Sequence, residues 1–235
     1  MHKAILFDLD GSLLPLDEDA FIRIYFEGVA RRFAGKYDQG TFMNAFWKGT
    51  LAMMGNDGSD TNKNVFWKTF KQYMKGDYEK IENEFLDYYL TDFGDVKAAC
   101  RPSPHAKKII DYLRGRAILI LATNPLFPRV ATHERIKWAG LEPEDFQLIT
   151  TYEDNRHSKP HLGYYRDILR RINLPAEECL MVGNDAKEDM VAGKLGMGTY
   201  LLTDCLINRE SLDISGFRSG SLEDFYAFIS GGVRP

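Results

Sequence analysis

The stretch that decides the fold lies near the N-terminus and reads Ala4-Ile5-Leu6-Phe7-Asp8-Leu9-Asp10-Gly11-Ser12. Its first residues form a short apolar run that ends at acidic residues, which is typical of a buried strand. Residues two apart in an extended chain point the same way, so Asp8 and Asp10 can face one ligand. Ligands of parallel sheets bind beyond the carboxyl ends of the strands, so the pattern predicts a site here. The alternative is a plain strand-to-turn exit, because Asp and Gly are common turn residues.

Similar apolar runs predict four further buried strands, at residues 117–121, 146–149, 179–182 and 199–202. Stretches with helical spacing lie between or beside the later runs, at residues 130–140, 162–172 and 187–196. Strand and helix therefore alternate from about residue 101 onward. This alternation predicts an α/β fold with a Rossmann-like parallel sheet covered by helices.

Residues 16–100 interrupt the alternation. They are rich in aromatic residues and in Lys and Glu at helix-like spacing, and they contain no convincing strand. We therefore expect an inserted helical domain at residues 16–100 and a catalytic core formed by residues 1–15 and 101–235. The first inserted helix should present one apolar face, made of Ile22, Tyr25, Phe26, Val29 and Phe33.

Two shorter patterns complete the expected organisation. The sequence Asn56-Asp57-Gly58-Ser59-Asp60 predicts a turn between helices of the insertion. Near the C-terminus, Ser221-Leu222-Glu223-Asp224-Phe225 predicts the capped start of a final helix.

Composition narrows the class of protein. The 235 residues include 34 acidic and 30 basic side chains, for a net charge of -4, which predicts neither nucleic-acid nor anionic-membrane binding. Three scattered cysteines, Cys100, Cys179 and Cys205, form no disulfide framework or zinc motif. No apolar run reaches membrane-spanning length and no secretion signal is present. We expect a soluble cytoplasmic protein, as a monomer or a homodimer.

Polar residues also follow the later predicted strands. Thr123 and Asn124 offer a hydroxyl and a backbone N–H to a phosphoryl oxygen, although both residues also favour strand ends and helix caps. Lys159 can neutralise charge shared by a carboxylate and a phosphate, although most lysines are simply solvated. Asp185 and Asp189 lie one helical turn apart and suit Mg²⁺ together with Asp8, while a capped helix start is the alternative for Asp185.

The conjunction of these elements carries more information than any one of them. In order along the chain they are Asp8-Leu9-Asp10-Gly11-Ser12, Thr123-Asn124, Lys159-Pro160, and Gly183-Asn184-Asp185 with Asp189. Each follows an apolar strand, and the set resembles the haloacid dehalogenase-like (HAD) hydrolase superfamily over nearly the whole chain. The resemblance implies a Rossmann-like core with an inserted helical cap, as in the phosphoglycolate phosphatase-like branch, and residues 16–100 match that cap.

The resemblance also implies a division of roles. Asp8 would be the nucleophile that becomes an aspartyl phosphate, and Asp10 would protonate the leaving oxygen and then activate water. Thr123 and the backbone of Asn124 would bind the phosphoryl group, and Lys159 would offset its charge.

For Mg²⁺, the resemblance implies Asp8, the Asp10 carbonyl and Asp185 as ligands, with Asp189 in support. Two residues depart from the usual pattern. Ser12 stands where threonine is more common, and Asn184 stands where many members have aspartate. The second departure leaves either Asp185 or Asp189 as the closer ligand.

Asp10 separates the reactions of the superfamily, because the dehalogenase branch generally lacks this second acid. We therefore expect a Mg²⁺-dependent phosphatase that acts on a small phosphorylated metabolite. A phosphomutase, a dehalogenase or a non-catalytic sensor of a phosphorylated metabolite are the alternatives. Substrate choice should lie in the helical insertion, and the motifs do not specify which phosphate ester is bound.

Overall fold

The computed structural model describes residues 2–231 and contains a six-stranded parallel sheet with the strand order β3-β2-β1-β4-β5-β6. The strands are β1 (Ala4–Phe7), β2 (Ile118–Leu121), β3 (Leu148–Ile149), β4 (Cys179–Gly183), β5 (Gly198–Leu202) and β6 (Ser219–Gly220). Central strand β1 pairs with β2 and β4, and all four of its residues are buried. Burial on both faces explains its continuous apolar sequence. The prediction of a parallel α/β sheet is confirmed.

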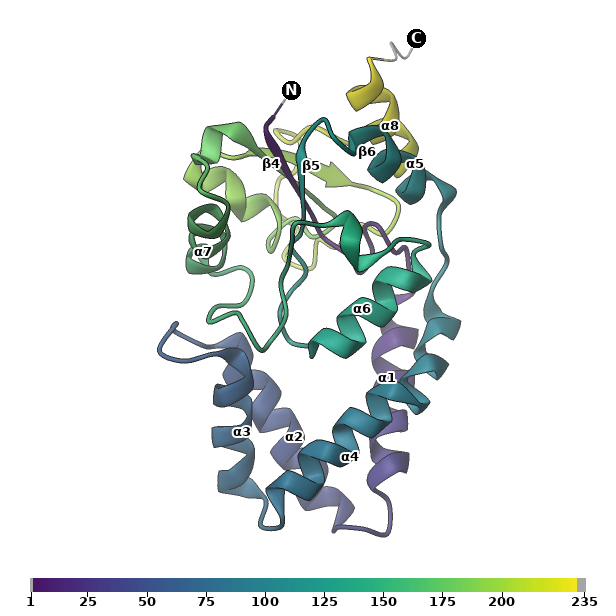
Figure 1. The fold of residues 1–235 in the computed structure, drawn as a ribbon, viewed down its shortest axis with the longest axis vertical. Coiled ribbons are helices and arrows are strands. Elements are labelled where there is room, and N and C mark those ends of the chain that lie inside the picture. Colours follow the sequence, from purple (N-terminus) through teal and green to yellow (C-terminus); the bar gives the residue numbers. More distant parts are fainter. Residues whose placement is uncertain (1, 232–235) are drawn as a thin grey trace.

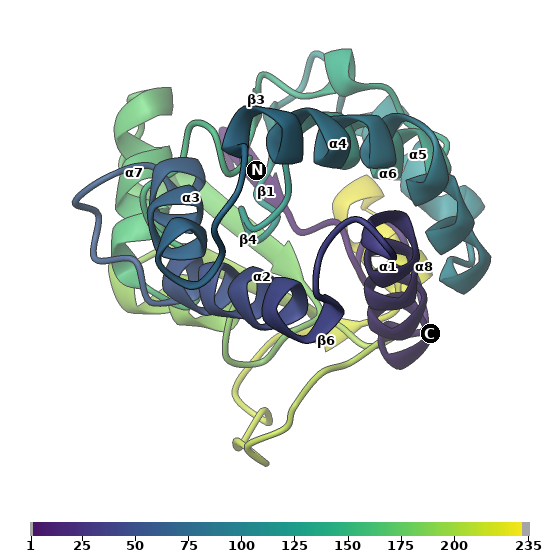
Figure 2. The same ribbon diagram turned by 90° about the horizontal axis from the view of Figure 1, so that it is seen from below.

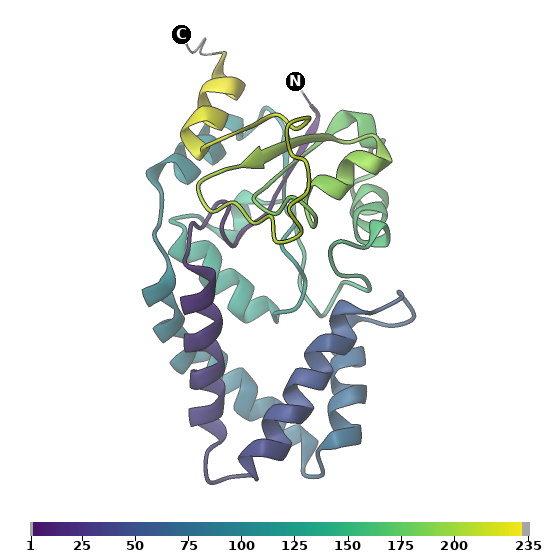
Figure 3. The ribbon, with the colours of Figure 1, turned by 180° about the vertical axis from the view of Figure 1, so that it is seen from behind.

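Helices cover the sheet and extend well beyond one of its edges (Figure 1). The α-helices are α1 (Glu18–Phe33), α2 (Gln39–Met54), α3 (Asn62–Tyr73), α4 (Tyr78–Leu90), α5 (Pro104–Leu113), α6 (Arg129–Trp138), α7 (Leu162–Ile172) and α8 (Leu222–Ser230). Short 3₁₀ helices are η1 (Asp92–Ala99), η2 (Pro143–Asp145), η3 (Ala176–Glu178) and η4 (Met190–Leu195). Strand β1 runs toward α1, so α1–α4 lie on the side where the strands end (Figures 1 and 3).

The inserted segment is helical because each of its helices has a clear start. Asp17, Asp38, Thr61 and Asp77 each accept a hydrogen bond from a backbone N–H of the following turn. Such capping satisfies donors that a helix start otherwise leaves open. Aromatic side chains then join the helices, for example α1 to α2 through the stacked rings of Phe33 and Phe42, 4.2 Å apart. The predicted turn at residues 56–60 and the capped start of α8 at Ser221 are also observed.

Helix α1 buries Tyr25, Val29 and Phe33 of its predicted apolar face together with Phe21, while Ile22 is 45% exposed. One local prediction is wrong. Residues 187–196 do not form an α-helix, but a turn followed by the 3₁₀ helix η4. The Asp185 side chain accepts the N–H groups of Lys187 and Glu188, which shapes that turn instead.

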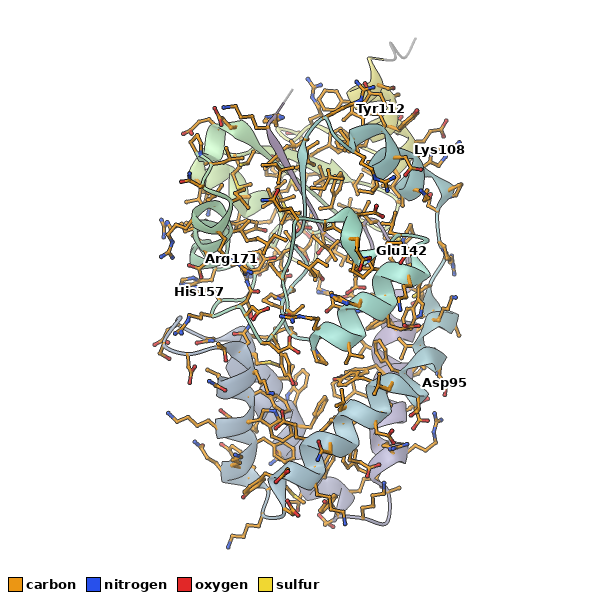
Figure 4. The ribbon with its side chains drawn as sticks, viewed as in Figure 1. Asp95, Lys108, Tyr112, Glu142, His157 and Arg171 are labelled. Atoms are coloured by element: carbon orange, nitrogen blue, oxygen red, sulfur yellow. The ribbon has the colours of Figure 1, made fainter. Side chains whose placement is uncertain are left out.

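Backbone and side-chain hydrogen bonds are among the contacts that join the inserted segment to the rest of the molecule. At its ends, Asp17 N–H donates to Ala99 O (3.0 Å) and Arg101 N–H donates to Pro15 O (2.7 Å). At the start of α3, away from both ends of the segment, the buried side-chain amide of Asn62 donates to Pro125 O (2.9 Å). Figure 4 shows His157 beside the loop that joins α2 to α3 near this contact. The predicted domain boundaries at residues 15/16 and 100/101 stay a prediction. The chain passes between the sheet and the inserted helices near both positions.

None of the helices within residues 2–231 is long and apolar enough to cross a membrane.

Candidate active site

The loop after β1 carries Asp8 and Asp10 and is fastened to the loop after β4. Ser12 Oγ donates to Asn184 Oδ1 over 2.8 Å, and both side chains are buried. Gly11 has φ = +78°, and a Cβ there would lie 2.3 Å from Asn184 Nδ2. Glycine therefore serves both the left-handed backbone and the close approach. The two departures noted in the sequence, Ser12 and Asn184, thus contact each other.

Lys159 lies behind Asp8 and bridges two acids. Its Nζ is 2.9 Å from Asp8 Oδ1 and 2.6 Å from Asp189 Oδ1, and the Lys159 side chain is fully buried. Burial lowers the pKa of Lys159, but the charges of Asp189 and Asp8 outweigh it and raise that pKa well above its usual value. Burial also raises the pKa of Asp189, against the pull of Lys159. The two carboxylate oxygens within 3 Å of its Nζ favour the protonated form of Lys159.

Asp10 has a partner that the sequence did not predict. Arg135, on α6, is completely buried and forms an ion pair with Asp10 Oδ2. Its guanidinium also donates to Thr132 Oγ1 (3.3 Å) and lies 4.3 Å from the centre of the Phe127 ring. Burial raises the pKa of Asp10, while the charge of Arg135 opposes that rise. Asp10 Oδ1 is buried and has no hydrogen-bond partner among residues 2–231.

Thr123 and Asn124 follow β2 at the same edge of the sheet. The Thr123 carbonyl accepts hydrogen bonds from Thr150 Oγ1 (2.6 Å) and the Tyr164 hydroxyl (2.9 Å), which fixes this strand end. Asn124 Oδ1 accepts the Lys159 N–H (3.2 Å), and Asn124 Nδ2 donates to Glu188 Oε2 (3.0 Å). The Asn124 side chain therefore joins the loops that carry Lys159 and Glu188.

Asp185 and Asp189 follow β4 but have different surroundings. Asp185 Oδ1 accepts two backbone N–H groups of its own turn, each at 2.8 Å. Both oxygens of Asp189 are engaged, Oδ1 by Lys159 and Oδ2 by the Asp185 N–H at 3.0 Å. Nearby, burial raises the pKa of Glu188 to about 7, with Lys159 opposing and neighbouring acids adding to the rise. Within residues 2–231, no group of three or more His, Cys, Asp or Glu side chains is arranged to hold a metal ion.

These residues open into a cavity of about 480 Å³ between the sheet edge and the inserted helices. From the core it is lined by acidic and polar side chains, including Asp8, Asp10, Thr123, Asn124, Asp185, Glu188 and Asp189. Its other wall comes from α1–α4, which surround this region when the molecule is seen from below (Figure 2). The structure therefore brings the residues of all four sequence motifs to one cavity, with Lys159 just behind its acidic wall.

The family model of haloacid dehalogenase-like hydrolases matches residues 2–196. The chain belongs to this family. The resemblance inferred from the motifs is thereby confirmed, as is the prediction that the protein is a hydrolase.

Individual HAD relatives extend along nearly the whole chain. The glyceraldehyde 3-phosphate phosphatase of Methanocaldococcus jannaschii is 28% identical over 233 residues, covering 97% of each chain. The pyrophosphatase PpaX of Oceanobacillus iheyensis is 24% identical over 192 residues, covering 82% of this chain and 78% of the relative. The crystal structure of a HAD phosphatase from Thermococcus onnurineus has a TM-score of 0.57 at 22% identity and covers 99% of this chain and 100% of its own. That likeness confirms the HAD fold.

Sequence reasoning missed Arg135 and Glu188 at this HAD site. A signal for Arg135 was present, because it shares a helix face with Ala131, Thr132 and Ile136, all of which are buried. A charged residue on such a face needs a buried partner of opposite charge. Glu188 lies between the two acids that were predicted, but nothing in its spacing distinguishes it from a solvated glutamate.

Proposed function

We propose that the protein is a Mg²⁺-dependent phosphatase that hydrolyses a phosphate monoester through an aspartyl phosphate on Asp8. The observation that carries the proposal is the buried Lys159, which holds Asp8 Oδ1 at 2.9 Å. This contact fixes the carboxylate, leaves Oδ2 free to attack phosphorus, and offsets the negative charge that gathers as a phosphate approaches. The phosphatase names of the M. jannaschii and O. iheyensis relatives support the same reaction class.

In the first step, Asp8 Oδ2 forms a bond to phosphorus while the bond from phosphorus to the ester oxygen breaks. Asp10 gives a proton to that leaving oxygen. In the second step, water attacks phosphorus, Asp10 takes a proton from the water, and the aspartyl–phosphate bond breaks to release inorganic phosphate. Thr123 and the Asn124 backbone bind the phosphoryl oxygens during both steps.

Arg135 acts on this reaction by positioning Asp10. It holds Asp10 Oδ2, so the other oxygen is the one that carries and releases the proton. That oxygen, Oδ1, lacks a partner among residues 2–231, and a buried charged oxygen without a hydrogen bond is unfavourable. Burial raises the pKa of Asp10 and the charge of Arg135 opposes that rise, so the two effects together suit a carboxyl group that gives a proton in one step and takes one in the next.

The oxygen donors at the cavity fit Mg²⁺. Asp8 and Asp185 both line the cavity, and Mg²⁺ is commonly held by one or two carboxylates with water and substrate phosphate. We propose that Asp8, the Asp10 carbonyl and Asp185 hold the ion, with Asp189 in support through its hydrogen bonds to Lys159 and Asp185. When bound, the ion would neutralise phosphoryl oxygens and orient the ester.

The decisive experiment replaces Asp8 by Asn and measures hydrolysis of p-nitrophenyl phosphate with Mg²⁺ and with excess EDTA. We expect no turnover in Asp8→Asn and none in the wild type with EDTA, with recovery of wild-type turnover on re-addition of Mg²⁺. The exposed Asp111→Asn is the matched control and should keep full activity, since the ion-pair partners of Asp111 among residues 2–231 are the surface cations Lys107 and Arg114. Circular dichroism checks that both variants are folded. Undiminished turnover in folded Asp8→Asn would exclude the aspartyl-phosphate mechanism.

A further inference from the structure

The wall of the cavity that faces the catalytic acids is strongly apolar. The inserted helices α1–α4 contribute Ile22, Phe26, Phe46, Trp47, Met54 and Trp67, among others. Three of these, Ile22, Trp47 and Met54, are each about 45% exposed and thus present apolar surface to the open space rather than to the helix packing. Exposed large apolar side chains that gather at a catalytic cavity are typical of ligand contact.

Polar groups on this wall are mostly paired with one another. The hydroxyls of Tyr25 and Tyr89 form a 2.6 Å hydrogen bond, and Thr50 Oγ1 donates to Phe46 O over 3.1 Å. Within residues 18–90, the lining donors left over are one hydroxyl hydrogen of the Tyr25–Tyr89 pair and the Trp67 indole N–H, which interacts with Tyr152. Two donors satisfy at most two oxygens, fewer than a sugar or polyol carries. Burying unpaired hydroxyl groups against this wall would be unfavourable.

The cavity also offers no free cation for a second anionic group. Among its described lining residues the cation is Arg209, which is paired with Glu18. Lys159 and Arg135 are held behind the wall by Asp8, Asp189 and Asp10. A carboxylate or second phosphate on the substrate would face acids on one side and apolar rings on the other.

We infer that the alcohol part of the substrate is an uncharged apolar group, such as an alkyl chain or an aromatic ring, rather than a polyol, a carboxylate or a second phosphate. This inference rests on the proposed phosphatase function and assigns the substrate class of the same site. The phosphate lies at Asp8 and the apolar group extends toward Trp47 and Met54. The cavity of about 480 Å³ has room for such a group.

The test is a series of n-alkyl phosphates from methyl to hexyl, because added methylenes leave the reactivity of the ester bond nearly unchanged. We expect kcat/KM to rise about fourfold per methylene, which is the value of roughly 0.8 kcal/mol for burying one CH₂. Two matched pairs test the polar alternatives: propyl phosphate against glycerol phosphate, and ethyl phosphate against phosphoglycolate. The apolar member of each pair should have the higher kcat/KM.

Two lysine variants on α2 locate the binding surface. Met54→Lys places a charge on the cavity wall, whereas Leu51→Lys places it at a position of similar exposure, 40%, that does not line the cavity. We expect Met54→Lys to flatten the dependence of kcat/KM on chain length, and Leu51→Lys to keep the full dependence. Equal losses on methyl and hexyl phosphate in Met54→Lys would leave the chain-length dependence unchanged and overturn the placement of the apolar group against this wall.

The possible outcomes separate the inference from the function it rests on. The inference is overturned if kcat/KM stays flat or falls along the alkyl series, or if the enzyme prefers glycerol phosphate or phosphoglycolate. In that case, Asp8-dependent hydrolysis of those esters still upholds the proposed phosphatase function. If no ester is hydrolysed, or hydrolysis does not depend on Asp8, the proposed function fails and the inference fails with it.

Discussion

Replacement of Arg135 by Met tests how the general acid is positioned. Arg135 is completely buried, whereas its partner Asp10 keeps 29% of its side chain exposed on the cavity side. Breaking a buried ion pair by removing one partner commonly destabilises a protein by about 3–5 kcal/mol. Because Asp10 is partly exposed, we expect a loss near the lower end of this range, at about 3 kcal/mol. For a chain of this length, that loss lowers Tm by roughly 6–12 °C.

The kinetic consequence depends on the leaving group. Proton donation contributes about 10²- to 10⁴-fold when the leaving oxygen is a poor one, so kcat/KM for an alkyl phosphate should fall by roughly 100-fold or more. p-Nitrophenolate leaves without a proton, so kcat/KM for p-nitrophenyl phosphate should fall much less. The parameter kcat/KM is the correct one because it reports steps up to release of the alcohol, before the shared hydrolysis of the aspartyl phosphate.

Two controls accompany this variant. Arg129→Met removes an arginine from the same helix, but Arg129 is 54% exposed and pairs with Asp154 at the surface, so stability should change by less than about 1 kcal/mol. Arg135→Lys keeps the charge and should recover part of the alkyl phosphate activity. Equal losses on both esters in Arg135→Met, measured on folded protein, would refute the positioning role and leave Arg135 a purely structural residue.

Two further substitutions probe the support of Asp8. Lys159→Met leaves Asp8 and Asp189 facing each other without a cation, so we expect loss of turnover. The free energy of unfolding, measured with urea, should fall by about 3 kcal/mol or more. An unchanged urea midpoint would contradict this expectation. Gly183→Ala would place a Cβ 2.1 Å from Asp189 Oδ2, so we expect about 1–3 kcal/mol of destabilisation and a reduced kcat. Gly94→Ala is the control, because a Cβ at Gly94 would meet nothing within 4 Å, and it should be neutral.

The position of most site residues was predictable because it follows from strand order alone. Asp8, Thr123 and Asp185 come directly after β1, β2 and β4, or within two residues of them. In a parallel sheet these ends meet at one edge whatever the exact twist or helix angle. Lys159 is different, since it follows β3 by ten residues and reaches Asp8 through a loop held by the Asn124 side chain. Its place at this edge was predicted from its position after the third predicted strand, while its role came from the resemblance.

Other features depend on information that a local pattern does not contain. Strand β6 has only the residues Ser219 and Gly220 and is defined by its neighbour β5 rather than by an apolar run. Ile22 fits the apolar spacing of α1, but periodicity does not distinguish a face that packs on other helices from one that borders a cavity. The predicted helix at residues 187–196 failed because Asp185 caps a turn there and because Gly193 and Gly196 weaken helix formation.

Two aspects of the site, the partner of Asp10 and the apolar wall, meet at Phe127. Its ring lies 4.3 Å from the Arg135 guanidinium on one side, and it contacts Tyr25 of α1, with ring centres 5.1 Å apart, on the other. Aromatic packing that excludes water strengthens the attraction between Arg135 and Asp10, because charges interact more strongly where the local dielectric constant is low. The inserted helices therefore do more than border the substrate. Changes near Tyr25 and Phe127 should affect both substrate choice and proton transfer, whereas changes at Met54, farther along the wall on α2, should affect substrate choice alone.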